Sequence, residues 1–424
     1  MKTRFDAIII GAGPAGSSAA ILLALAGWSV AVVEKQSFPR RKVCGECIAA
    51  GNLALFDALG IGVEFDAIAG PPLSQVALMS GKLCIAADLP PLAHPRHRWG
   101  RALGRERLDT LLLERARQAG ATILQPWRAE AIHGGAGAFQ CEVRAVGEHG
   151  AAMRLTAPVL IAAHGSWERR PRAAPEALPP QRHADLFAFK ANFIDAELAA
   201  GLLPVLAFDG GYGGIVVAED GLATLACCIR RDRLRACRSG MPGAQAGEAV
   251  ERMLKAACGG VRQALSGARR QGSWLGIGPI RPGIRLHAGG GVFLIGNAAG
   301  EAHPIIGEGI SMAMQSSWLL CERLLGDNAA IRGGGPQQRV QRDYTLAWKR
   351  CFATRIRVAA WFAHLAMRPG LASGLLPLLR QWPGVLTQAA RISGKTRLAV
   401  NPQAIETMLG NQSLSSIHQS ALQE

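Results

Sequence analysis

The hydrophobic positions at the start of the chain fall into three blocks separated by glycines. Residues 6–10 form a short β-branched run that ends at a glycine, and residues 15–26 are rich in helix formers. Gly27 closes the second block, and a further apolar run covers residues 29–34. Short apolar runs bounded by glycine are typical of buried strands, and a longer run closed by glycine is typical of a helix. The pattern therefore predicts a strand–turn–helix–strand unit.

Further along the chain the hydrophobic pattern changes several times. Residues 103–120 are spaced as an amphipathic helix that ends at a glycine. The next segments alternate as strands do, and we expect residues 121–165 to form a meander. Residues 168–181 contain four prolines and are expected to be a linker. Strands are then expected within residues 183–194 and 210–231, a helix near residues 247–258, and a strand, loop and long helix within residues 291–325.

Composition narrows the class of protein. With 424 residues the chain is long enough for two or three structural units. Hydrophobic residues make up 49% and charged residues 18%, so the chain is globular and rich in apolar residues. Glycines, prolines and arginines interrupt its two most apolar regions before the roughly 20 residues that a membrane span requires. We therefore expect a cytoplasmic protein that is not integral to a membrane.

The charge and the cysteines add two further expectations. A net charge of +16 attracts anions, among them nucleic acid, an acidic partner protein, a lipid surface or a phosphorylated cofactor. Only two tyrosines are present and no basic run is interleaved with aromatic residues, so a nucleic-acid surface is not expected. The ten cysteines follow no export signal and are expected to be reduced thiols, several of them buried.

The turn after the first strand has the pattern G-x-G-x-x-G. Its first glycine permits the turn, the second lets the backbone approach a pyrophosphate, and the third lets the helix pack on the strand. Glu34 ends the second strand 18 residues beyond the third glycine, where an acid can bind a ribose hydroxyl. An acid there favours a ribose without a 2′-phosphate, and so FAD or NAD. The residues expected to bind the dinucleotide are Gly11, Gly13, Pro14, Ala15, Gly16 and Glu34.

A second glycine-rich segment, GNAAGEAHPIIGEG, covers residues 296–309. It resembles the G-D-A-A-x-x-x-x-P-x-x-G-x-G motif of the flavoprotein monooxygenases of the para-hydroxybenzoate hydroxylase fold, with their geranylgeranyl reductase and halogenase relatives. The resemblance covers roughly residues 1–330 and implies FAD as cofactor. It also implies that the residue after the first glycine holds the ribityl chain, and that the helix start after the proline faces the flavin, where it stabilises negative charge. The positions implied are Gly296, Asn297, Pro304, Gly307, Gly309 and Ile310.

Two positions depart from the family pattern. Asn297 stands where the family has aspartate, and can still hydrogen-bond a ribityl hydroxyl but carries no charge. His164 and Gly165 stand where the family has an Asp-Gly pair that contacts FAD and NAD(P)H, and a histidine cannot accept charge-assisted bonds as a carboxylate does. The resemblance implies NADPH or NADH as electron donor, with a histidine in place of the aspartate in the motif that would contact it. Arg105 matches the family arginine near the FAD phosphates, or is a solvated charge at a helix start.

A Cys-x-x-Cys segment, Cys44 to Cys47, follows the second strand. By itself it is compatible with a redox dithiol or half of a zinc site, but zinc needs a second ligand pair, and the chain has no other Cys-x-x-Cys, so no metal is expected. The geranylgeranyl reductase branch has K-x-C-G here, similar to Lys42, Cys44 and Gly45. The resemblance therefore places Cys44 and Glu46 beside the flavin as candidate catalytic residues, and leaves open whether Cys47 makes the pair redox-active.

Two further residues are candidates for substrate chemistry. The segment FDGGYGGIVV resembles the stretch in these flavoproteins where an aromatic residue lines the cavity beside the flavin, which makes Tyr212 a candidate for substrate contact. It is equally compatible with a core residue of a strand. His303 lies next to Pro304 and is a candidate acid or base, with a structural role as the alternative.

These motifs predict an α/β fold: a Rossmann-like FAD-binding domain interrupted by an α+β substrate domain with an antiparallel sheet, followed by a C-terminal helical region. The resemblance implies an FAD-dependent monooxygenase that hydroxylates an apolar, aromatic or carrier-tethered substrate through a flavin C4a-hydroperoxide. Partners would be that substrate, an acidic carrier protein or a membrane surface. The expected boundaries are 1–75, 100–170 and 275–330 for the FAD-binding domain, 76–99 and 175–274 for the substrate domain, 331–400 for the helical region and 401–424 for a polar tail.

Two other functions remain open. One is a reductase of the geranylgeranyl type that delivers hydride to an isoprenoid double bond. The other is a flavin-binding protein without turnover, which the departures at His164 and Asn297 keep open. The halogenase branch carries a W-x-W-x-I-P motif that this chain lacks, so halogenation is not favoured.

Overall fold

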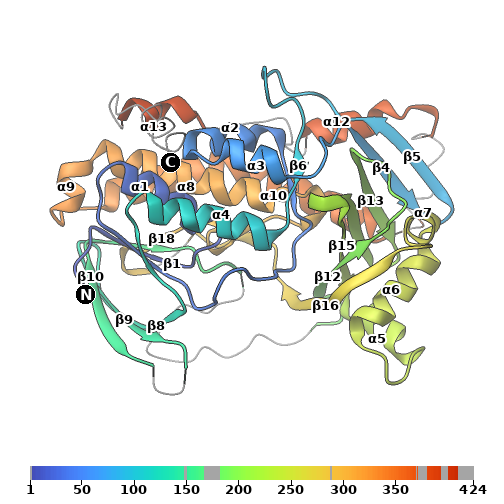
Figure 1. Ribbon diagram of the computed structural model, residues 1–424, viewed down its shortest axis with the longest axis horizontal. Coiled ribbons are helices and arrows are strands. Elements are labelled where there is room, and N and C mark those ends of the chain that lie inside the picture. The colour runs from blue at the N-terminus through green and yellow to red at the C-terminus, as the bar shows by residue number, and fades with distance from the viewer. Residues whose placement is uncertain are drawn as a thin grey trace.

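Two sheets organise the computed structural model, one beside the glycine turn at residues 11–16 and one further along the molecule (Figure 1). The structure describes residues 2–147, 150–166, 182–286, 289–368, 370, 380–392 and 400–408. The first sheet has five parallel strands in the order β18-β11-β1-β2-β7 within these residues. Its strands are β1 (Ala7–Ile10), β2 (Val30–Val33), β7 (Thr122–Leu124), β11 (Val159–Ala162) and β18 (Phe293–Leu294).

Four strands of the parallel sheet, β1, β2, β11 and β18, are apolar at every position and buried on both faces. Ala7 and Ile9 of β1 face a core formed with helices, whereas Ile8 and Ile10 face a second core formed with a three-stranded meander. Helix α1 packs between α4 and α8 in the helical layer (Figure 1). The layer contains α1 (Pro14–Leu25), α2 (Ala50–Leu59), α3 (Gly62–Ile68), α4 (Arg105–Gln118) and α8 (Gly309–Gly326), and the meander contains β8 (Trp127–Gly135), β9 (Ala138–Ala145) and β10 (Ala152–Ala157).

The second sheet is mostly antiparallel and has seven strands within the described residues, in the order β16-β12-β15-β14-β13-β4-β5; β13 and β4 are parallel to each other. One face packs on α6 and α7 through residues such as Phe193 and Val250. The opposite face, which includes Tyr212, contacts the end of α10 at Ala363. Its elements are β4 (Gln75–Ser80), β5 (Leu83–Asp88), β12 (Leu186–Ile194), β13 (Leu202–Phe208), β14 (Gly211–Val217), β15 (Ala223–Arg230) and β16 (Arg269–Ile280), with helices α5 (Arg231–Ser239), α6 (Ala246–Ala257) and α7 (Gly259–Ala264).

The remaining elements connect the two sheets or cover them. Two short strand pairs lie at the junction: β3 (Cys47–Ile48) with β6 (Arg101–Ala102), and β17 (Gly283–Ile284) with β19 (Gly300–Glu301). Helix α12 lies against β4 and β5, as Figure 1 shows. None of the helices in the described part of the chain is long and apolar enough to cross a membrane. The C-terminal helices are α9 (Asn328–Arg332), α10 (Gln338–Ala366), α12 (Gly384–Ile392) and α13 (Pro402–Met408).

The structure confirms the predicted fold and corrects one part of it. The N-terminal strand–turn–helix–strand unit and the antiparallel second sheet are present. The segment 121–165 is not one meander, because its first and last strands, β7 and β11, join the parallel sheet. Pro126 and Pro158 lie where the chain passes between the parallel sheet and the three-stranded meander. The predicted linker at residues 168–181 lies outside the described residues, and the domain boundaries stay a prediction.

Candidate functional site

The glycine turn between β1 and α1 is shaped by close backbone approach. Gly11 has a φ of +100°, and a side chain at Gly16 would lie 1.9 Å from the Gly11 carbonyl oxygen. Both positions therefore require glycine. Gly13 is different, because the nearest atoms to an added methyl group would be the guanidinium groups of Arg105 at 3.7 Å and Arg40 at 3.8 Å. An open backbone at the start of a helix, faced by two guanidinium groups, is suited to bind a pyrophosphate.

Glu34 and Asp109 anchor this end of the site. The Glu34 carboxylate is buried and accepts hydrogen bonds at 2.9 Å from the backbone N–H groups of Ala12 and Gln36. Asp109 is also buried and holds Arg105 through two hydrogen bonds of 2.6 and 2.7 Å. Arg40 lies 3.6 Å from Glu34 and 3.5 Å from Asp109. The two acids therefore fix the two guanidinium groups over the glycine turn.

The loop after β2 carries the predicted Cys44 and Glu46 into the same region. Glu46 has a φ of +58°, a conformation that non-glycine residues rarely adopt. Its side chain turns into the protein, where it pairs with Lys190 of β12. It accepts hydrogen bonds from Thr224 Oγ1 of β15 at 2.6 Å and from the backbone N–H of Arg105 at 2.9 Å. This buried ion pair joins the loop after β2 to the second sheet.

The two cysteines of the Cys-x-x-Cys segment lie in different surroundings. Cys44 is half-buried, accepts a hydrogen bond from the Glu46 N–H at 3.3 Å and interacts with the Arg105 guanidinium. Cys47 is buried in strand β3, within an apolar cluster that includes Leu73. Both cysteines line the cavity, Cys44 beside the Arg105 guanidinium and Cys47 from within the apolar cluster.

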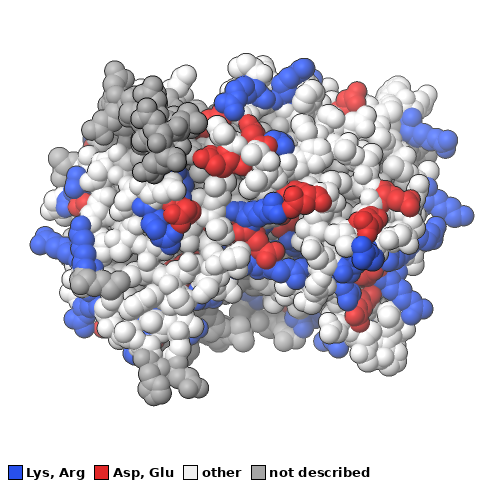
Figure 2. Space-filling view, in the orientation of Figure 1, with Lys and Arg blue, Asp and Glu red and all other residues white. Residues whose placement is uncertain are grey.

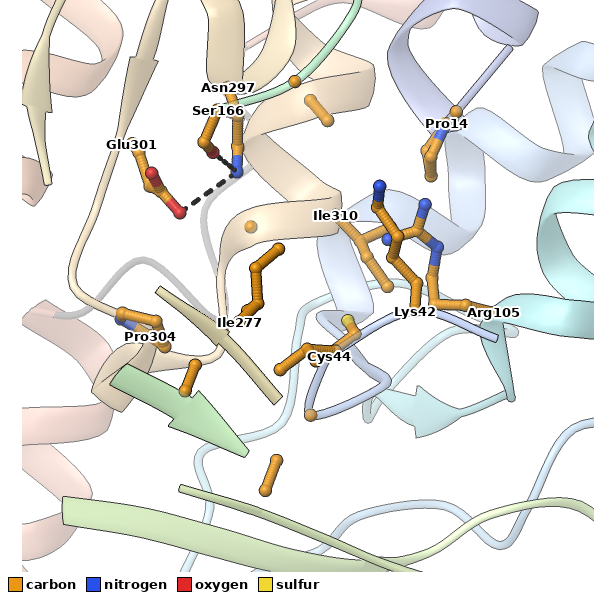
Figure 3. A pocket seen from close by; sticks show the side chains of 18 of the residues that line it. Pro14, Lys42, Cys44, Arg105, Ser166, Ile277, Asn297, Glu301, Pro304 and Ile310 are labelled. Carbon is orange, nitrogen blue, oxygen red and sulfur yellow. Dashed lines mark hydrogen bonds between the residues drawn. The ribbon is translucent and has the colours of Figure 1, made fainter. Parts of the chain in front are cut away.

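Asn297 is part of a polar cluster at the other end of the site (Figure 3). Its amide nitrogen donates to Ser166 Oγ at 3.0 Å and to Glu301 Oε1 at 3.3 Å. Glu301 also pairs with Arg285 at 3.1 Å, and the same arginine donates to the Asn297 carbonyl oxygen. The family aspartate is therefore absent, but a carboxylate lies four residues further along and contacts the asparagine.

The start of α8 faces the same cavity. Gly307 has a φ of +64° and turns the chain from Pro304 into the helix, which begins at Gly309. Gly309, Ile310 and the preceding loop line the cavity, so the N-terminus of an 18-residue helix points at it. The partial positive charge there favours an anionic group, as the resemblance implies for the flavin.

Tyr212 and His303 meet at the second sheet. Tyr212 is buried in β14, and its hydroxyl lies 3.1 Å from His303 Nδ1. Burial raises the pKa of Tyr212 well above its usual value, with Cys228 adding to the shift. Burial and the neighbouring His364 lower the pKa of His303 to about 4. Both side chains are therefore neutral at physiological pH.

One continuous cavity of about 490 Å³ connects these groups. It runs from the glycine turn, past the Cys44 loop and the start of α8, to the second sheet at Tyr212. His164 and Gly165 also line it, and His164 Nδ1 lies 3.1 Å from the Gly165 carbonyl oxygen. Every predicted site residue lines the cavity except Gly16, which packs against the turn. The lining residues among them are Gly11, Gly13, Pro14, Ala15, Glu34, Lys42, Cys44, Gly45, Glu46, Arg105, Tyr212, Gly296, Asn297, His303, Pro304, Gly307, Gly309 and Ile310.

Three parts of the site were not predicted from the sequence. Arg40 lies in a basic stretch with no distinguishing motif. Lys190 could have been noticed as the one charged residue within a mostly apolar strand, LFAFKANFI. Glu301 lies within the second glycine motif, and the loss of the family aspartate at Asn297 was the available signal to look for another acid nearby.

The residues present fit FAD. Figure 3 shows Lys42 and Arg105 extending toward the Pro14 end of the cavity, opposite the polar cluster at Asn297. The cavity thus combines a cationic end for the pyrophosphate, polar groups for a ribityl chain and a helix N-terminus for the flavin ring. Gly13 and Gly309 contribute no side chain that would fill this space.

Comparison with known proteins supports the same conclusion. The family model described as FAD binding domain matches residues 4–198. The chain is 26% identical over 378 residues to digeranylgeranylglycerophospholipid reductase 1 of Methanopyrus kandleri, which covers 85% of this chain and 90% of that protein. It is 34% identical over 129 residues to a menaquinone reductase of Mycobacterium tuberculosis, 30% of each chain. The myxobacterial chondrochloren halogenase CndH has the same fold, with a TM-score of 0.72, 19% identity and 96% and 97% of the two chains covered.

These similarities support FAD binding by part of the chain and establish the fold of the whole. The match to the FAD binding domain covers a little less than half of the chain, and the fold is shared with flavoproteins that include a halogenase and a geranylgeranyl bacteriochlorophyll reductase-like protein. The matches to the menaquinone reductases span only 16 to 30% of those proteins. The similarity to solved structures establishes the fold, and the reaction is a separate question.

Proposed function

We propose that the protein is an FAD-dependent monooxygenase that hydroxylates an apolar or aromatic substrate. The observation that supports this most directly is the continuity of the cavity from the glycine turn to the apolar face of the second sheet. Phe189, Leu203 and Val205 line its far end. A substrate placed there would lie next to the flavin-facing start of α8.

The chain's own residues would orient the substrate and exclude water. FAD, when bound, would supply the redox chemistry and the reaction with oxygen. Ala363, Ala366 and Met367, at the end of α10, pack in one apolar cluster with Tyr212 and shield that side of the sheet from solvent. Exclusion of water from such a site protects reactive intermediates from hydrolysis and other side reactions.

The electron donor in this proposal is NADPH or NADH. The family's Asp-Gly pair is replaced by His164 and Gly165, which line the cavity here. A neutral or cationic imidazole in place of a carboxylate changes which nicotinamide binds and how tightly. Mixing the FAD-loaded protein with each nicotinamide under anaerobic conditions would identify the donor by the rate of flavin bleaching.

We also propose that the substrate reaches the protein from a lipid surface. Trp361 of α10 and Trp382, Val385 and Ile392 at α12 are exposed by 41 to 62%. Exposed tryptophans near arginines suit contact with an anionic membrane. Figure 2 shows basic and acidic side chains intermixed on the visible face, so its charge is not collected into one nucleic-acid surface. Cosedimentation with anionic vesicles tests the proposal, and an acidic carrier protein is the alternative if vesicles do not bind.

The reducing cytoplasm is the location that suits the protein's ten cysteines.

A second candidate function is reduction of isoprenoid double bonds. It is favoured by the 378-residue alignment with the Methanopyrus reductase and by the K-x-C-G pattern at Lys42 to Gly45. The cavity's apolar end suits an isoprenoid chain as well as an aromatic ring.

Oxygen dependence separates the two candidates. The FAD-loaded protein would be reduced anaerobically and mixed with phenolic compounds or with geranylgeranyl lipids, with and without isotopically labelled oxygen gas. A monooxygenase transfers the label into a phenolic product and forms no product without oxygen. A reductase forms a saturated lipid anaerobically and incorporates no label. Product formation without oxygen would therefore refute the monooxygenase proposal.

A further inference from the structure

Tyr212 and His303 connect the cavity to a third ionisable side chain. The Tyr212 hydroxyl and His303 Nδ1 are 3.1 Å apart, within hydrogen-bonding distance, and both residues line the cavity. The His303 ring lies in turn 6.0 Å from the His364 ring, measured between centroids. The tyrosine comes from β14, His303 from the loop before α8, and His364 from α10. Three elements distant in the sequence therefore bring three proton-carrying groups into one row.

Exposure changes in order along this row. Tyr212 is 1% exposed, His303 is 9% exposed, and His364 is exposed to solvent. The row thus begins at the surface of α10 and ends inside the cavity, beside the second sheet. Protons cannot cross apolar packing without such carriers, since a charge without partners in a protein interior is strongly disfavoured.

We infer that His364, His303 and Tyr212 form a proton path from solvent to the substrate end of the cavity. The inference rests on the proposed function, and it applies to both candidate reactions. Hydroxylation combines a substrate C–H bond, oxygen, a nicotinamide hydride and one solvent proton to give an alcohol and water. Double-bond reduction combines the alkene, a hydride and one proton to give an alkane. Each turnover consumes one proton that the nicotinamide does not supply.

The groups around the path suit transfer between neutral carriers. Burial and His364 keep His303 neutral, with its pKa lowered to about 4, and burial keeps Tyr212 protonated. Tyr212 can therefore give up its hydroxyl proton only as it receives another from His303. The other titratable groups that influence Tyr212 are Cys228 of β15, which hydrogen-bonds to it, and Glu301 of β19.

The test uses oxygen as the probe and needs neither a nicotinamide nor the natural substrate. The FAD-loaded protein is photoreduced without oxygen and then mixed with oxygenated buffer. Anionic reduced flavin would supply two electrons and one proton, and solvent the second proton, to convert oxygen into hydrogen peroxide. The rate of reoxidation is measured in light and heavy water. Removing a general acid typically costs 10²–10⁴-fold, so we expect Tyr212→Phe and His303→Asn to slow reoxidation by about 10-fold or more and to lose the solvent isotope effect.

The chain offers a matched control. Tyr344 is the only other tyrosine; it is buried and donates a hydrogen bond of 2.7 Å to the Leu294 carbonyl oxygen. Tyr344→Phe should reoxidise at the rate of the unmodified protein and keep its isotope effect. His364→Ala should be slower, and added imidazole should restore its rate, because the missing ring lies at the surface. A merely structural role would produce neither the isotope effect nor the rescue.

A separate readout does not depend on bound FAD. In the FAD-free protein, nitrogen NMR of the imidazole rings should show His303 shifted by Tyr212→Phe and unaffected by Tyr344→Phe. The inference is overturned if Tyr212→Phe and His303→Asn reoxidise as fast as the unmodified protein, or if they retain its isotope effect. Failure of oxygen labelling in a product would refute the monooxygenase proposal alone and would leave the proton path standing.

Discussion

The ion pair between Glu46 and Lys190 joins the loop after β2 to the second sheet and is deeply buried. The side chains are 1% and 2% exposed. Glu46 also accepts hydrogen bonds from Thr224 and from the Arg105 N–H, whereas Lys190 has Glu46 as its charged partner. The perturbation to make is Glu46→Gln, which keeps the shape of the side chain and removes its charge.

The expected cost follows from what the variant leaves behind. Removal of one partner from a buried ion pair costs about 3–5 kcal/mol, because the remaining charge stays buried without compensation. Glu46→Gln should fall within this range, since it leaves the Lys190 ammonium in the core. Lys190→Met should cost less, because two hydrogen-bond donors still face the carboxylate. The double variant should cost less than the sum of the two, since both remove one interaction.

Denaturant unfolding of the FAD-free protein measures these costs, with FAD affinity as a second readout because the pair holds the Cys44 loop. Glu130→Gln is the control, since its partner Arg144 lies at the surface and the two side chains are 41% and 49% exposed. That variant should change the free energy of unfolding by less than about 1 kcal/mol. The reasoning is refuted if Glu46→Gln costs no more than the control, or if the double variant is additive.

Three further predictions concern the same cavity. Burial lowers the pKa of His303 from 6.5 to about 4, so between these pH values the unfolded chain binds a proton that the folded chain does not. The free energy of unfolding should therefore fall by up to about 3 kcal/mol as the pH drops from 6.5 to 4, and His303→Asn should flatten this part of a pH-dependent unfolding curve. Gly13→Ala should fold normally, because its methyl group meets nothing nearer than 3.7 Å, yet bind FAD at least about 10-fold more weakly in a titration; Gly16→Ala should not yield folded protein, since its methyl group would lie 1.9 Å from a backbone oxygen. Asn297→Asp should destabilise the protein by about 1–3 kcal/mol because it replaces a donor to Glu301 with a second carboxylate, and Asn297→Asp combined with Glu301→Gln should recover most of that loss in thermal unfolding.

The sequence was most informative where a local pattern determines local structure. The glycine spacing at Gly11 to Gly16 is such a case, because the turn itself excludes side chains at two of the positions. The apolar runs at residues 6–10 and 29–34 form neighbouring parallel strands, because short apolar runs rich in β-branched residues suit buried strands. The strands within residues 121–165 were assigned to the wrong sheet because alternation identifies strands but not their partners, although Pro126 and Pro158 marked the breaks.

Contacts between distant segments could not be read from the sequence. Glu46 and Lys190 are 144 residues apart, and nothing near Glu46 indicates that its side chain forms a salt bridge with the second sheet. The row from Tyr212 to His303 and His364 likewise depends on the fold of three elements. The Cys-x-x-Cys spacing likewise gave no indication that Cys47 lies in strand β3, within the apolar cluster that includes Leu73.

The most direct test of the account is the flavin content of the purified protein. The protein would be saturated with FAD, passed through a desalting column, and denatured to release and identify the flavin. The glycine turn, the two guanidinium groups at Gly13 and the cluster at Asn297 predict one FAD per chain, and an Arg105→Ala variant should retain much less. A protein that binds no FAD, or that binds FMN equally well without using the pyrophosphate end, would contradict the account.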